Sequence, residues 1–228
     1  MAGDAVVPGC RVGRRPMKSL TFPGGSVVAL LLCSMTASAC AFIPGDKKTR
    51  DGLGPVSADT HKVSQASEYP DLTAEEAGRR VLNLVDGLES MDELSLWCVI
   101  ERTGIPLKYA PAGKVHALAV ELSRDAGFYN VIYRDKGGRR FVEIRYEAPD
   151  KPGAAGTFPC ALGVTAVADR LKALGYGMTT DADEIGRTLE HIFSRNDVRV
   201  RVVPSQHSMP SPLGIDSCVE VLTIQSKD

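Results

Sequence analysis

Histidines and clustered carboxylates are the side chains in this sequence that could support acid–base or metal chemistry. The four histidines are spread singly over the chain: His61, His116, His191 and His207. None stands at the spacing of a shared metal site. Asp181, Asp183 and Glu184 lie together, but at this position they suit the start of a helix, and no calcium-binding loop follows. We therefore expect no metal site, no cofactor and no catalytic residue.

Cysteines predict a disulfide bond rather than a redox or zinc site, because no CxxC pair occurs in the sequence. Three of the six cysteines fall in the part of the chain expected to fold: Cys98, Cys160 and Cys218. We expect Cys98 to bond with Cys160, which joins a helix to a long loop. Cys218 is expected to be a small buried side chain within a strand. A different pairing remains an open alternative.

The N-terminal region has the pattern of an export signal. Arg14, Arg15 and Lys18 precede about nine largely apolar residues that begin at Val27, which is too short a run to span a bilayer as a helix. Small side chains then lead to Cys40. Residues 1–39 are therefore interpreted as a signal peptide. A start at Met17 would also be normal, which leaves residues 1–16 as a possible extension of the reading frame.

The run Ala37-Ser38-Ala39-Cys40 resembles a bacterial lipobox. In that family the cysteine becomes the mature N-terminus and carries acyl chains. The resemblance implies a lipid on Cys40 and attachment to the periplasmic side of the outer membrane. The usual leucine is replaced by Ala37, and the small residues also fit an ordinary cleavage site, so release into the periplasm is the alternative.

Charge argues against nucleic-acid binding. Residues 1–39 contain four basic residues and one acidic residue, which leaves 23 basic against 27 acidic residues and a net charge of −4 from Cys40 onward. Proteins that bind nucleic acid rely on an excess of Lys and Arg to neutralise phosphates. No nucleic-acid partner is therefore expected. The expected partners are the membrane, reached through the lipid that the lipobox resemblance implies, and another protein of the envelope.

Residues 40–72 are polar, contain glycine and proline, and predict a flexible tether, so a single folded domain is expected over residues 73–228. Thr73 and Glu76 form a capping box before a helix, and Ser90 and Glu93 form a second one. Two further helices are expected, one ending at Gly175 and one opening near Asp181 and continuing through Ile192.

Alternating apolar residues predict strands around Leu118, Val131, Val142, Val200 and Leu222. Two helices followed by antiparallel strands thus occur twice. The expected fold class is α+β, with helices packed on one face of an antiparallel sheet. A duplicated α-α-β-β unit is one interpretation of the repeat.

Strand alternation places one set of side chains on the face of the sheet away from the core. These side chains are Phe141, Glu143, Arg145, Arg199 and Arg201. Aromatic and arginine residues are enriched at protein interfaces. The set therefore predicts a partner-binding surface, with a solvated sheet face as the alternative.

We expect a lipoprotein that binds another protein without catalysis and acts by occlusion. This class is similar to periplasmic immunity proteins and lysozyme-inhibitor lipoproteins, which neutralise secreted effectors or lytic enzymes. An accessory subunit of an envelope or secretion assembly is a second hypothesis. An envelope hydrolase is a third, because catalytic triads assemble from distant positions that a sequence does not reveal.

Overall fold

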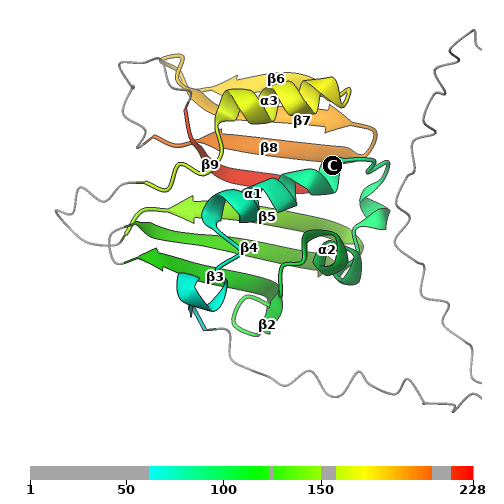
Figure 1. Ribbon diagram of the computed structural model, residues 1–228. Helices are drawn as coiled ribbons and strands as arrows, with labels where there is room; N and C mark the ends of the chain where they lie inside the picture. The colour runs from blue at the N-terminus through cyan, green and yellow to red at the C-terminus, as the bar shows by residue number, and fades with distance from the viewer. Residues whose placement is uncertain (1–61, 124–125, 150–157, 207–216, 228) are drawn as a thin grey trace, which may run out of the picture. The chain divides into compact units, whose positions relative to one another are not determined.

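Nine strands form a single sheet in the computed structural model, which describes residues 62–123, 126–149, 158–206 and 217–227 (Figure 1). The strands are β1 (Ser64–Gln65), β2 (Lys108–Ala110), β3 (Val115–Ser123), β4 (Gly127–Lys136), β5 (Arg139–Glu147), β6 (Gly177–Ala182), β7 (Thr188–Arg195), β8 (Val198–Pro204) and β9 (Val219–Ser226). Their order is β1-β3-β4-β5-β9-β8-β7-β6, and β2 pairs with β3 off this path. The sheet is mixed, because β1 runs parallel to β3 while the other pairs are antiparallel.

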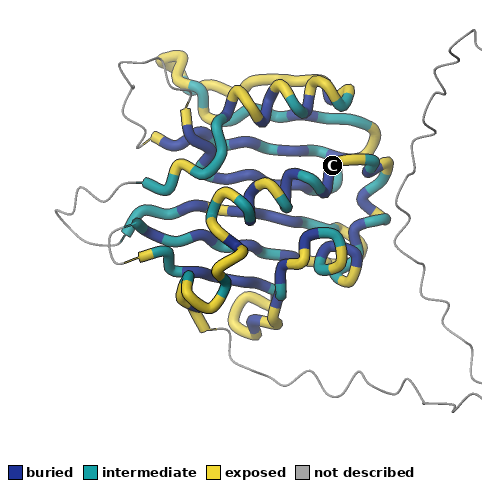
Figure 2. Tube along the Cα trace, in the orientation of Figure 1, coloured by how far each residue is buried: buried dark blue, intermediate teal, exposed yellow. Residues whose placement is uncertain are grey.

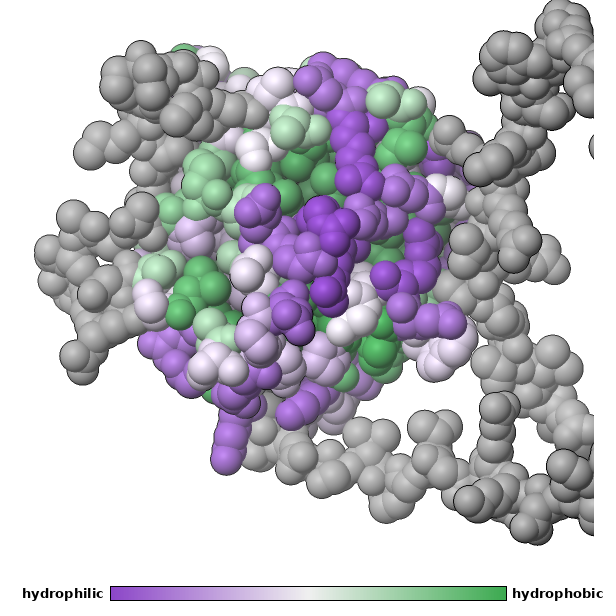
Figure 3. Space-filling view, viewed as in Figure 1, coloured by the Kyte–Doolittle hydropathy of each residue, from purple (hydrophilic) through white to green (hydrophobic). Residues whose placement is uncertain are grey.

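Helices lie on one face of this sheet, so the predicted α+β class is confirmed (Figure 1). The α-helices are α1 (Ala74–Leu82), α2 (Leu96–Thr103) and α3 (Val164–Ala173), and the short 3-10 turns are η1 (Ala66–Glu68), η2 (Asn83–Val85) and η3 (Met91–Glu93). Buried residues follow the central strands, whereas exposed residues follow β6 and the outward sides of the helices (Figure 2). A band of hydrophilic residues crosses the helix side of the domain (Figure 3).

Apolar side chains from the helices and from the inner face of the sheet form the main core. Val81 and Val85 from the α1 region are fully buried, as are Tyr129 of β4, Ile144 of β5 and Leu222 of β9. Because β5 and β9 are neighbours at the middle of the sheet, the first and second halves of the chain share this core. The core therefore joins the predicted halves into one folded unit.

The start of α1 is the best predicted helix boundary. The Thr73 hydroxyl accepts a hydrogen bond from the Glu76 backbone N–H at 3.2 Å, as the capping box requires. The Glu76 carboxylate does not return to the cap. It accepts instead from Arg79 at 2.6 and 2.8 Å and from Arg80 at 2.6 Å, and these guanidinium groups lower its pKa to about 2.

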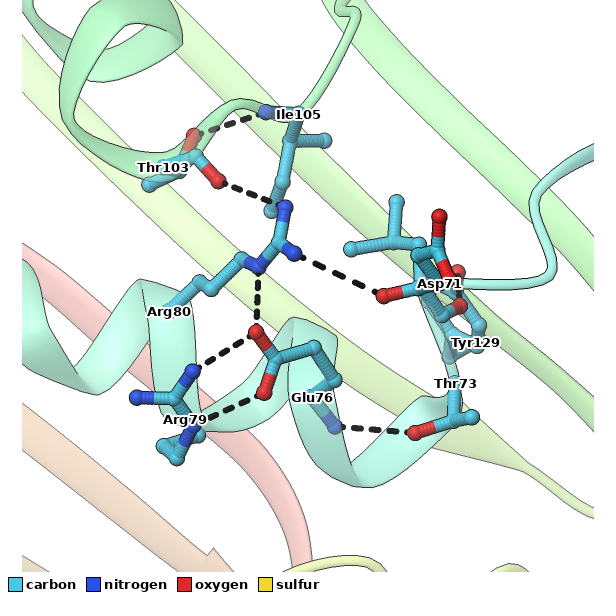
Figure 4. Close-up of polar contacts among 9 residues, drawn as sticks. Asp71, Thr73, Glu76, Arg79, Arg80, Thr103, Ile105 and Tyr129 are labelled. Atoms are coloured by element: carbon cyan, nitrogen blue, oxygen red, sulfur yellow. Dashed lines mark hydrogen bonds and ion pairs between the residues drawn. The ribbon is translucent and has the colours of Figure 1, made fainter.

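Arg80 ties α1 to two other segments (Figure 4). Its guanidinium donates to the Thr103 carbonyl at the end of α2, at 3.2 Å, and reaches the Asp71 carbonyl at 3.5 Å. The Tyr129 hydroxyl of β4 donates to the Leu72 carbonyl at 2.6 Å, and burial raises its pKa to about 12. These contacts fix α1 and the chain before it on the sheet.

The second capping box was expected to open a helix, and the structure places that helix slightly later. Ser90 caps only the 3-10 turn η3, by accepting from the Asp92 N–H. Helix α2 begins at Leu96, where the Ser95 hydroxyl accepts from the Cys98 N–H. Gly104 ends α2 in the left-handed conformation, which glycine adopts readily.

The helix predicted from Asp181 through Ile192 is wrong, because these residues form the hairpin of β6 and β7. Asp183 organises the turn by accepting from the backbone N–H groups of Ile185 and Arg187, at 3.1 and 2.8 Å. Ile185 and Leu189 are 76% and 45% exposed, so their helical spacing was coincidental. Within its described residues, the second half of the chain therefore contributes one helix and four strands.

The predicted bond between Cys98 and Cys160 is also wrong, since Cys160 is bonded to Cys218, with a Cα–Cα distance of 5.2 Å. The cause is a short antiparallel bridge between Gly163 and Cys218 just before α3. In this bridge the Val219 N–H donates to the Leu162 carbonyl at 2.8 Å. The bridge places the two cysteine backbones side by side, so Cys218 is a disulfide partner and not a lone buried side chain.

Candidate functional site

The sheet has a face that the described helices leave uncovered, which we call the outer face. Its position follows from β5, where the Tyr146 hydroxyl donates to the Ala74 carbonyl of α1 at 3.2 Å and so marks the helix side. Successive side chains of a strand point to opposite faces. Phe141, Glu143 and Arg145 therefore lie on the outer face, as the sequence predicted.

Strand register brings the predicted residues of β5 and β8 into neighbouring rows. Strand β9 lies between them, and its Thr223 stands opposite both Glu143 and Arg201. The adjacent row contains Phe141, Gln225 and Arg199. All five residues singled out in the sequence thus lie on the outer face, three on β5 and two on β8, with β9 between these strands.

Glu143 is the buried centre of this surface, with 9% of its area exposed. Its carboxylate accepts from Arg145 Nε and from the Thr223 hydroxyl, each at 3.3 Å. A buried carboxylate is costly unless it is paired and hydrogen-bonded, and here both conditions are met. Arg145 itself remains about half exposed and is available to a partner.

Arg201 is also held in place by a carboxylate. Its Nε and Nη2 atoms both contact Glu190 Oε2 of β7, at 2.8 and 2.5 Å. Glu190 was not predicted as part of this surface, because its segment was predicted to be helical. Its alternation with Ile192 along β7 would have been a signal for a strand with these side chains outward.

Apolar side chains lie among these charges. Ile132 of β4 is directly opposite Glu143 and packs against a small cluster of Ala110, Val115 and Ala117, separate from the main core. Outer-face positions also include half-buried apolar side chains: Phe128, Phe141, Ile192 and Val203. The surface is thus partly apolar and partly charged, which is the composition of many non-obligate protein interfaces.

The histidines and carboxylates considered for chemistry are separate in the structure. The His116 ring lies tilted against the rings of Tyr109 and Tyr133, with centroid distances of 5.3 and 6.5 Å, and burial lowers the pKa of His116. His191 contacts the Thr180 hydroxyl at 3.1 Å. Arg187 binds the Asp183 carboxylate at 2.7 Å and lowers its pKa. Among the described residues no three potential metal ligands come together.

Other residues discussed in the sequence fall outside the described ranges, namely Cys40 with its signal peptide, His61 and His207. Within those ranges no helix is long and apolar enough to cross a membrane. Comparison with protein-family models, with curated proteins and with solved structures gave no match to this chain.

Proposed function

We propose that this protein is an exported lipoprotein, anchored through Cys40 to the periplasmic side of the outer membrane, whose domain binds another protein without catalysis. The export and lipid parts of the proposal rest on the N-terminal sequence. The binding part rests on the outer face. In this proposal the domain covers the working surface of its partner, such as a secreted effector or a lytic enzyme.

The observation that carries the binding proposal is the arrangement of five side chains on one face of β5 and β8, on either side of β9: Phe141, Glu143, Arg145, Arg199 and Arg201. The described helices all pack on the opposite side, so this face is left for another molecule. Hydrogen bonds and ion pairs already hold Glu143 and Arg201 in fixed geometry. A partner would therefore find a preorganised surface, which lowers the entropic cost of association.

We also propose that the two halves arose by duplication of a unit with one helix and three antiparallel strands. The strand order supports this idea, because β3-β4-β5 on one side of the sheet mirrors β7-β8-β9 on the other, with β5 and β9 adjacent in antiparallel orientation. α1 precedes the first set and α3 the second. The proposed unit has one helix and three strands, whereas the repeat expected from the sequence had two helices and two strands.

Lipid attachment is tested by metabolic labelling. Cells that express the full chain in the presence of radioactive palmitate should yield a labelled protein in the outer-membrane fraction. The Cys40→Ser variant should lose the label and move to the soluble periplasmic fraction, because its mature N-terminus has no thiol to acylate. An unlabelled, soluble wild-type protein would show that the chain is released and that the anchor is wrong.

Partner binding is tested by co-purification of the full chain from envelope extracts. Phe141→Ala combined with Arg145→Ala should reduce recovery of the partner at least tenfold, because aromatic and arginine anchors dominate interface energies. The matched control is Trp97→Ala with Lys172→Ala, which removes an exposed aromatic and a cation from the helix side. Loss of the partner in the control alone would assign binding to the helices and contradict the proposal.

A further inference from the structure

One end of the outer face contains an open pocket of about 390 Å³, where the β4–β5 hairpin meets the end of β9. Arg134 and Lys136 line it from β4, Arg139 and Phe141 from β5, and Lys227 from the residue after β9. Arg140, Gln225 and Ser226 complete the lining, so five of the eight lining residues are cations in a mature chain of net negative charge. Positive charge is therefore concentrated at one place that the overall composition conceals.

The charged side chains of the β4–β5 hairpin are arranged differently on the two faces of the sheet. On the helix side, Asp135 and Arg140 are paired across the strands and form an ion pair at 3.2 Å. Arg140 also donates to the Met91 carbonyl at 3.1 Å, so this pair belongs to the packing of η3. On the outer side next to the turn, Arg134, Lys136 and Arg139 form no ion pair with a carboxylate of the described residues, so the two sides of the hairpin differ in how their charges are paired.

Lys136 stands directly opposite Arg139 beside the turn. Like charges at opposing cross-strand positions lower stability. No ion pair joins Arg134, Lys136, Arg139 or Lys227 to a carboxylate of the described residues. Arg134 instead lies over the Phe141 ring, 5.7 Å from its centroid. A bound anion would offset the repulsion between these cations and so stabilise the folded protein.

We propose that this pocket, which we call the hairpin pocket, receives an acidic segment of the protein partner. The inference rests on the proposed function, because Phe141 belongs both to the pocket and to the outer face. The cations come from β4, from β5 and from the residue after β9, and they surround an aromatic ring and Gln225. They therefore suit several carboxylates of a chain that continues over the outer face. Anionic lipid headgroups are the competing source of negative charge.

The test uses the full chain with Cys40→Ser, so that no lipid anchor interferes, and a fluorescent peptide of twelve glutamates as the probe. Anisotropy titration should show binding that weakens as salt rises, since exposed charges are screened. Arg134→Gln with Lys136→Gln and Arg139→Gln should lower affinity about tenfold, because each exposed ion pair contributes a small factor. The control replaces Lys62, Lys114 and Lys172 with Gln, which removes the same charge elsewhere and should leave affinity unchanged.

Equal binding by the triple variant, or no binding of the peptide to the unsubstituted pocket, would overturn the inference. So would binding to phosphatidylglycerol vesicles without binding to the peptide, which would assign the pocket to lipid. The proposed function fails separately, when Phe141→Ala with Arg145→Ala leaves partner recovery from envelope extracts unchanged. If partner recovery depends on Phe141 and Arg145 but is unchanged by the triple variant, only the proposal of an acidic segment in the hairpin pocket is refuted.

Discussion

Replacing Cys160 and Cys218 together with alanine should lower the free energy of unfolding by about 4 kcal/mol. The bond links residues 58 positions apart, so its loss frees a long loop in the unfolded chain. It also loosens the bridge between Gly163 and Cys218 that leads into α3. Urea unfolding of the full chain under oxidising conditions measures the loss, and the wild-type protein in reducing agent should approach the same value.

A single Cys218→Ala substitution distinguishes this bond from the pairing expected from the sequence. It should cost nearly as much stability as the double replacement, because Cys160 then has lost its partner. Peptide mapping without reduction should recover a peptide pair that contains Cys160 and Cys218. A pair that contains Cys98 and Cys160, together with unchanged stability of Cys218→Ala, would contradict the structure.

The strands were predictable because apolar and polar side chains alternate along each of them, and this alternation is visible in the sequence alone. Val142, Ile144 and Tyr146 alternate with Phe141 and Glu143, and the structure buries the first set and leaves the second on the outer face. The turn between β4 and β5 was also local, since Gly137 and Gly138 adopt positive φ there. Local chemistry was sufficient for these elements.

The β6–β7 hairpin was missed because its apolar residues follow two patterns at once. Ile185, Leu189 and Ile192 fit a helix, yet Phe193 is the fully buried residue of this segment and belongs to the strand pattern. The exposed edge strand β6 gave no apolar alternation to decide the matter. Tertiary pairing of β7 with β8 settled a choice that local propensity left open.

The sequence predicted which side chains of the candidate surface point outward. It did not predict which of them become neighbours across the strands. Alternation identified Glu143 and Arg201 as outward residues without the order of the strands. Only the insertion of β9 between β5 and β8 shows that Thr223 joins them. The disulfide prediction was wrong for the same reason. The Cys160–Cys218 contact depends on a long-range pairing that the spacing of cysteines in the sequence does not encode.

Gly78→Ala should lower the free energy of unfolding by about 1–3 kcal/mol, although alanine favours an isolated helix by about 1 kcal/mol. Gly78 lies buried in α1 where the helix crosses β5. A Cβ atom there would overlap the Tyr146 hydroxyl and come within 2.9 Å of Leu162 Cδ1. Since Tyr146 is fully buried, the added methyl group must push the helix away from the sheet.

A double-mutant cycle with Tyr146→Phe separates this overlap from a general effect on the helix. Tyr146→Phe alone should cost about 1 kcal/mol, because the Ala74 carbonyl loses its hydrogen bond from the hydroxyl. In the Gly78→Ala background the same change should cost less or become stabilising, since it removes the overlapping oxygen. Additive losses, or a Gly78→Ala protein more stable than the wild type, would mean that α1 does not approach β5 this closely.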